Sequence, residues 1–288
     1  LQYFPPKMSV VGNGIKRGLT AVEAGVLLEE PLDKVLTMIL FGLLKKQAIT
    51  VINKDPMKIQ PNEPLPEGLN DYEKAFIAAF KESGTAKQRS ALQVVIVDLV
   101  KSVKEKMKGF NNEETKSYYK DIVRRAWLAV EGAETPEIKS AQFDHTLEWT
   151  MLDNQFDNRT QKTFISQPVF LPRWWGLYTP GYSTPSIGSS GSSTSSTSGS
   201  SKPSFSMPNI PGSDFAASIV NGSTAFSAGI VGNLTGFTSG VTSRTNPIPV
   251  TRSTSGSSGF RGGGGGGSSC ACACACAGCA CACAGGGR

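Results

Sequence analysis

Residues 20–60 read TAVEAGVLLEEPLDKVLTMILFGLLKKQAITVINKDPMKIQ, and this stretch decides the fold class. Thr20 and Glu23 have the spacing of a capping box, in which each side chain satisfies a backbone N–H of the first turn, so a helix is expected to about residue 29. Pro31 favours the start of a second helix to about residue 47. Residues 48–53 and 57–60 predict two strands joined by a turn. The order helix, helix, hairpin predicts a winged-helix-like module over residues 19–61.

This module raises the question of DNA binding, because a winged helix that binds DNA lays its second helix in the major groove. The outward positions of that helix carry Thr37, Met38 and Phe41, and the hairpin offers only Lys54 and Lys58 as cations. The net charge of +6 over 288 residues is spread along the chain rather than gathered in a basic patch. We therefore favour a protein contact and expect no specific nucleic acid; a DNA-binding regulator with a metal- or redox-sensing tail is the alternative.

A second helical region is expected over residues 70–180. A proline-rich linker at 61–69 separates it from the winged-helix-like module, and another linker is expected at 1–18, before that module. The helices are predicted at 71–82, 86–108, 112–131 and 135–156. Three of them open on the capping-box pairs Asn70/Glu73, Thr85/Gln88 and Asn111/Glu114. Phe143, Leu147, Trp149 and Met151 are the expected packing residues of the fourth. The expected fold class is mainly α, with a winged-helix-like module plus a small helical bundle, followed by a long disordered low-complexity tail.

Residues 168–180, PVFLPRWWGLYTP, end this region with an aromatic stretch. Trp174 and Trp175 suit an anchor at a membrane interface. We favour the other interpretation, in which the stretch packs back across the helices and closes their core.

The sequence contains no complete motif for a catalytic site. His145 is the single histidine, and with Glu148 it forms half of a two-metal pattern that needs a second histidine. No serine lies in a GxSxG elbow. We therefore expect a protein that is not an enzyme.

Three segments together resemble a known family: residues 18–28 (GLTAVEAGVLL), Met151-Leu152-Asp153 and residues 168–175 (PVFLPRWW). They look like the cytosolic half of bacterial predicted membrane proteins of unknown function, of the type called domain of unknown function 2207. The resemblance covers about residues 15–180 and implies an extracytoplasmic β domain and a membrane helix ahead of a winged-helix-like region. It brings no catalytic residues. We expect a fragment whose anchor lies upstream, at the cytoplasmic face of the membrane; a cytoplasmic location is the alternative.

Behind a Ser/Gly linker at 181–213, residues 214–246 divide into three elevens: DFAASIVNGST, AFSAGIVGNLT and GFTSGVTSRTN. Eleven residues make three turns of helix, so equivalent side chains form one apolar stripe. The stripe consists of Phe215, Ile219, Phe226, Ile230, Leu234, Phe237 and Val241. Glycines weaken such a helix in water, so it is expected to order only when the stripe meets a membrane surface or a protein groove. The alternative is a low-complexity segment with accidental periodicity.

A Gly/Ser linker at 247–269 leads to the tail at 270–288, CACACACAGCACACAGGGR, which holds every cysteine of the chain. These are Cys270, Cys272, Cys274, Cys276, Cys279, Cys281 and Cys283. Thiolates bind soft metals, and closely spaced thiolates can share a cluster, so the tail predicts zinc or copper(I) binding. Lipidation or enzymatic modification of the tail, disulfide cross-linking between chains, and a simple-sequence expansion without a role are the alternatives.

Overall fold

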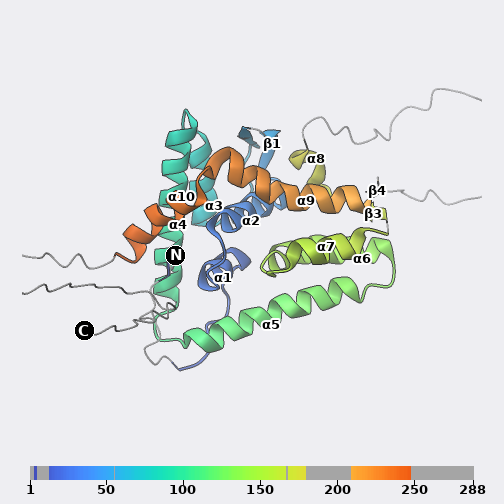
Figure 1. Cartoon of the computed structure of the whole chain (residues 1–288), viewed down its shortest axis with the longest axis horizontal. Helices are drawn as coiled ribbons and strands as arrows, with labels where there is room; N and C mark the ends of the chain where they lie inside the picture. Colours follow the sequence, from blue (N-terminus) through green and yellow to red (C-terminus); the bar gives the residue numbers. More distant parts are fainter. Residues whose placement is uncertain (1–2, 5–12, 55, 167, 180–208, 248–288) are drawn as a thin grey trace, which may run out of the picture. The chain divides into compact units, whose positions relative to one another are not determined.

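The computed structural model describes residues 3–4, 13–54, 56–166, 168–179 and 209–247, and over these it is mainly helical (Figure 1). The predicted helix, helix, hairpin order is present as α1 (Ala21–Leu27), α2 (Leu32–Lys45), β1 (Ile49–Lys54) and β2 (Met57–Pro61). The Thr20–Glu23 capping box forms as expected. The strands pair antiparallel, with Val51 opposite Ile59 and a register shift between Val51 and Asn53.

Helix α2 is buried on every side. Thr37, Met38 and Phe41, which the sequence predicts to face outward, are each 0% exposed. The helix contacts α1 and β1, and also α3 (Asp71–Phe80), α6 (Pro136–Thr150), α8 (Trp175–Tyr178), α9 (Gly212–Phe226) and α10 (Leu234–Thr245). A helix that is apolar all round is a core helix, and this one has no free face for a DNA groove. The winged-helix assignment is not confirmed beyond the order of its elements.

The second region contains α3 (Asp71–Phe80), α4 (Thr85–Lys106), α5 (Asn112–Glu131), α6 (Pro136–Thr150) and α7 (Phe156–Phe164). Asn70 and Glu73 form a capping box, and the Asn111 side chain accepts from the N–H of Glu114. The Thr85/Gln88 prediction is wrong, because Gly84, at φ +93°, holds the N-cap position of α4.

The fourth predicted helix is in fact two. It ends near Met151, and α7 begins at Phe156. The Asp153 carboxylate accepts from the backbone N–H of Gln155, and the Phe156 N–H donates to the Asp153 carbonyl. Arg159 of α7 then pairs with both Asp153 and Glu131 at 2.7 Å, which ties the turn to α5. Of the expected packing residues, Phe143, Leu147 and Met151 are buried, and Trp149 stacks on Tyr119.

The aromatic stretch closes the core, as the favoured interpretation predicted. It forms β3 (Pro168–Phe170) and α8 (Trp175–Tyr178). Trp174 and Trp175 are both buried, and the indole N–H of Trp174 donates to Asp144 at 2.6 Å. One core draws residues from every described helix and from the strands at 49–54, 57–61 and 168–170, so the boundary expected between residues 19–61 and 70–180 does not separate two cores.

Residues 209–247, here called the docked segment, complete the fold. They form β4 (Asn209–Pro211), α9 (Gly212–Phe226), a π-helical turn (Ser227–Val231) and α10 (Leu234–Thr245). β4 pairs antiparallel with β3, with Val169 opposite Ile210. Figure 1 shows the segment, in orange, running along α2 and α4, which both contact it. The helix is broken at Gly232, at φ +63°, and restarts at the Asn233 cap, so the three elevens do not form one continuous helix.

The chain's first described residues also belong to the core. Tyr3 and Phe4 are buried, and the Tyr3 hydroxyl donates to the Glu30 carbonyl at 2.8 Å. The carbonyl of Tyr3 accepts from the Thr245 hydroxyl at 2.7 Å. The predicted linker at 1–18 therefore includes an anchored pair of residues.

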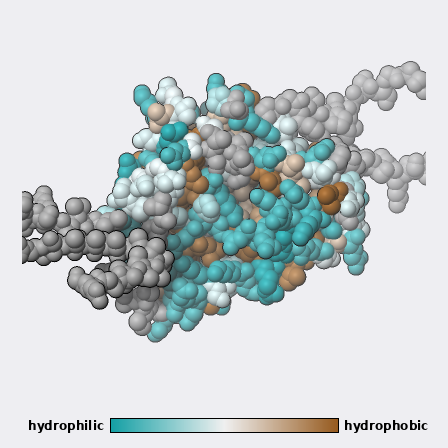
Figure 2. Space-filling model, in the orientation of Figure 1, coloured by the Kyte–Doolittle hydropathy of each residue, from teal (hydrophilic) through white to brown (hydrophobic). Residues whose placement is uncertain are grey.

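The face seen in Figure 2 is largely hydrophilic, with separated hydrophobic residues. Among the helices of the described residues, none combines the length and apolar composition needed to cross a bilayer.

Candidate functional site

We consider two candidate sites among the described residues. One is a polar pocket between α1, α3 and α4, and the other is the contact between the docked segment and the rest of the protein. The pocket has a volume of about 360 Å³. Its lining carries three carboxylates, Glu23, Asp71 and Asp98, with Lys106 and the ring of Tyr72.

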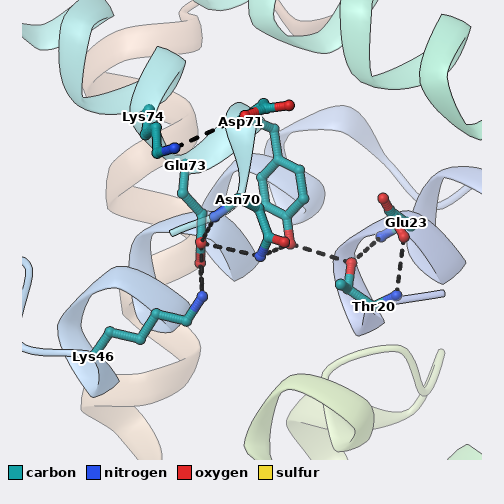
Figure 3. Close-up of polar contacts among 8 residues, drawn as sticks. Thr20, Glu23, Lys46, Asn70, Asp71, Glu73 and Lys74 are labelled. Atoms are coloured by element: carbon teal, nitrogen blue, oxygen red, sulfur yellow. Dashed lines mark hydrogen bonds and ion pairs between the residues drawn. The ribbon is translucent and has the colours of Figure 1, made fainter. Parts of the chain in front are cut away.

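Hydrogen bonds and ion pairs connect several polar groups at and beside this pocket (Figure 3). The Tyr72 hydroxyl donates to the Thr20 hydroxyl at 3.2 Å and accepts from the Asn70 amide at 3.1 Å. The Asn70 amide also donates to Glu73 at 3.0 Å. Tyr72 therefore joins two capping boxes, that of α1 and that of α3, through side chains that helix starts already require.

Each buried carboxylate of the network has a lysine partner. Lys106 lies 2.5 Å from Glu23, and Lys46 lies 2.6 Å from Glu73. Both glutamates are 4% exposed at the side chain, whereas the two lysines extend to solvent. Each ion pair offsets part of the desolvation of its buried carboxylate, so loss of the lysine would leave an uncompensated buried charge.

The ionisation of the neighbouring groups agrees with that role. Burial raises the pKa of the Tyr72 hydroxyl well above its ordinary value. Burial also raises the pKa of the Glu148 carboxyl, against the opposing effect of Lys45 and Lys46. Glu148 and Glu73 both lie beside Gly42 of α2, where a β-carbon would be 3.5 and 3.7 Å from their respective Oε1 atoms. The Tyr72 hydroxyl and the two lysine-paired carboxylates thus connect α1, α2, α3 and α4.

The predicted metal ligands, the cysteines from Cys270 to Cys283, lie outside the described residues. Within the described ranges, no group of three or more His, Cys, Asp and Glu side chains is arranged to hold a metal ion. His145 is exposed, and the carbonyls of Asp144 and His145 accept from Lys45.

The structure places the predicted contact stripe in the core. Phe215, Ile219, Ile230, Phe237 and Val241 are buried, and Leu234 is partly buried. The side chain of Phe226 lies outside the described residues. The segment was expected to order on a membrane or in a protein groove, and here the groove belongs to its own chain. Trp174 and Trp175, the other predicted contact residues, are buried as well, and the ring of Trp175 lies 5.0 Å from that of Phe215.

Sequence reasoning missed the residues that receive this segment. Arg89 and Gln93 of α4 donate to the carbonyls of Ile230 and Phe237, at 3.2 and 3.3 Å. Tyr178 of α8 donates to the carbonyl of Ser218 at 3.3 Å. Glycines of the segment lie where these side chains approach: Gly222 at Tyr178, Gly232 at Arg89 and Gly240 at Gln93.

Comparison of the chain with protein-family models, with curated proteins and with solved structures finds no match in any of the three.

Proposed function

We propose that this protein is a non-enzymatic interaction protein whose helical body carries a thiol-rich tail that binds a soft metal ion. The observation that carries the proposal is the placement of the cysteines. All seven lie between positions 270 and 283, and the 269 residues before them contain none. A protein that keeps thiols out of its core and gathers them at one end uses them there.

The chemistry of the tail favours zinc or copper(I). Both ions prefer thiolate ligands, and alternation with alanine and glycine leaves the backbone free to turn around an ion. Cys276 and Cys279 add the C-x-x-C spacing that is common in zinc sites. The sequence supports the class of ion and leaves the choice between the two to experiment.

The resemblance to domain of unknown function 2207 supports a location at the cytoplasmic face of a membrane. The proposed partners of residues 214–246 are a membrane surface or a protein groove. The apolar stripe packs against the rest of the protein, so these residues must detach from it before they can contact lipid. Flotation of the protein with neutral, highly curved vesicles tests whether residues 214–246 bind lipid. Wild type should float, and Phe226→Ser should float less.

Native mass spectrometry of the reduced protein tests the metal proposal. Full-length chain, a chain that ends at Ser269, and a full-length chain with all seven cysteines replaced by serine are titrated with Zn²⁺ and with Cu(I). We expect uptake by the full-length chain and none by the other two. Equal uptake by all three would overturn the proposal, because the metal would then be bound by the body.

A further inference from the structure

The docked segment occupies a groove that is defined by named contacts. Here the body means described residues 3–179, and the groove is the surface of the body that residues 209–247 touch. The α9 helix contacts α2, α7 and β3, and α10 contacts α2 and α4. Phe215 packs in an aromatic cluster with Phe143, Phe164 and Trp175 at ring distances of 5.0 to 5.9 Å. Buried apolar side chains of α9 and α10 therefore pack against the body on both sides of the break at Gly232.

Glycines of the segment lie where the groove comes closest. A β-carbon at Gly222 would overlap with the Tyr178 hydroxyl and would lie 3.3 Å from Phe41. A β-carbon at Gly240 would lie 2.6 Å from the Gln93 amide. Gly236, by contrast, would meet only its own Asn233 cap, at 3.5 Å or more. The flexible Gln93 side chain can move away from position 240, so the groove distinguishes glycine from larger residues chiefly at position 222, which is a property of a binding site for a helix of defined sequence.

Tyr178 is fixed in place. Its ring lies 5.2 Å from Phe41 and 5.8 Å from Trp175, and the Lys54 ammonium lies 3.9 Å from its centre. Burial raises the pKa of Tyr178 to about 12, so its hydroxyl keeps the proton that it donates to Ser218. A rigid ring cannot turn aside for a larger side chain at position 222.

The chain between the body and the docked segment is long enough for the segment to bind either the groove of its own chain or that of a second molecule. Residues 180–208 join Thr179 to Asn209 and are rich in Ser and Gly. A chain of this length reaches ~95 Å when extended and ~30 Å on average when flexible. A body of this size has a diameter of roughly 40 Å. The connection is therefore long enough for the segment to reach the groove of a neighbouring molecule.

We propose that the groove is a binding site for a helix with glycine at these positions, and that it accepts residues 209–247 from a second copy of this chain. Reciprocal exchange would join two copies, with β4 of one chain paired to β3 of the other. Exchange of an identical element is a common route to dimers, because every native contact is kept. The connecting chain holds the segment at an effective concentration of about 1 mM near its own groove, where it competes with the segment of a second copy. Cutting this chain removes that advantage, so exchange of segments between copies can be measured.

The experiment uses full-length chain with a specific protease site inserted after Ser193, prepared with light and with heavy isotopes. A thermal melt recorded by circular dichroism before cleavage shows whether the chain with the insertion is folded. The light and heavy proteins are cleaved, mixed under reducing conditions and followed by native mass spectrometry. We expect the two fragments to stay together and mixed-isotope pairs to rise to about half of all complexes. If the fragments remain paired only with their original partners, or separate at once, the proposal is overturned.

Matched glycine variants test the specificity. Gly222→Ala should weaken retention of the segment at least tenfold, whereas Gly236→Ala, the same change at an exposed position of α10, should leave it equal or tighter because alanine favours helix. Adding Tyr178→Phe to Gly222→Ala removes the atom that clashes and should recover part of the loss. Equal behaviour of the Gly222 and Gly236 variants would contradict a sequence-specific groove. Transfer of the cleaved segment to neutral vesicles in preference to a second body would show that lipid, and not a second copy, is its partner.

Discussion

The ring of Phe215 lies 5.0 Å from the ring of Trp175 and 5.6 Å from that of Phe164, although the three residues come from different parts of the chain. Phe215 is 2% exposed, so the docked segment contributes to the main core. Phe215→Ala should lower the free energy of unfolding by about 3–5 kcal/mol, measured by denaturant titration of the full chain. Ile165→Ala, at a residue 65% exposed, is the control and should change it by less than about 0.5 kcal/mol. Similar losses for both variants would mean that the segment is not part of the cooperative unit.

The Lys46–Glu73 pair should stabilise the fold more than its neighbour Lys74–Asp71. Lys46→Met leaves the buried Glu73 carboxylate without its 2.6 Å partner and should cost about 1–3 kcal/mol, since Lys46 itself is partly exposed. Lys74→Met removes a pair at 4.0 Å whose side chains are both in solvent, and it should produce no measurable change. Thermal denaturation at low and high salt checks both; a loss for Lys46→Met that disappeared in high salt would contradict a buried contribution.

Glu148 predicts a pH dependence of stability with a definite sign. Burial raises its pKa in the folded state, so the folded protein binds more protons than the unfolded chain across the interval between the two pKa values. Stability from this group is therefore complete at low pH and is lost as the pH rises through the raised value. Glu148→Gln should be more stable than wild type at pH 7, and the difference should vanish near pH 4. A difference that stays constant from pH 4 to pH 7 would refute this.

Substitution of Gly84 should destabilise the protein through backbone strain and not through a steric clash. Its φ of +93° suits glycine, and a β-carbon there would meet nothing within 4 Å. Gly84→Ala should therefore lose about 1–3 kcal/mol from backbone strain alone. Gly176→Ala also has free space around the new β-carbon but no positive φ, and it should show no loss. The two variants, compared by chemical denaturation, separate strain from packing.

Much of the fold follows from local chemistry. The capping pairs at Thr20, Asn70 and Asn111 predicted helix starts, because a capping side chain and its backbone partner lie within one turn. The break after Met151 was missed because the bond that fixes α7, from Arg159 to Glu131, joins residues on separate helices.

The site was less predictable for the same physical reason. Periodicity found the stripe of residues 214–246, yet the groove depends on Tyr178, Arg89 and Gln93, which meet the stripe only in the folded chain. The sequence of α2 is apolar around its whole circumference, which indicates a helix covered on all sides. The burial of Tyr3 and Phe4 had no signal in the sequence.

The hydrogen bond from Thr245 to the carbonyl of Tyr3 brings together backbone positions near the two limits of the described chain. A circular permutant that joins these positions by a short peptide and opens the chain between residues 180 and 208 should therefore keep every described contact. In such a molecule the segment would become the amino-terminal part of the protein and would leave the ribosome before the body that receives it. The order of synthesis of the two halves would then be reversed without changing the final architecture.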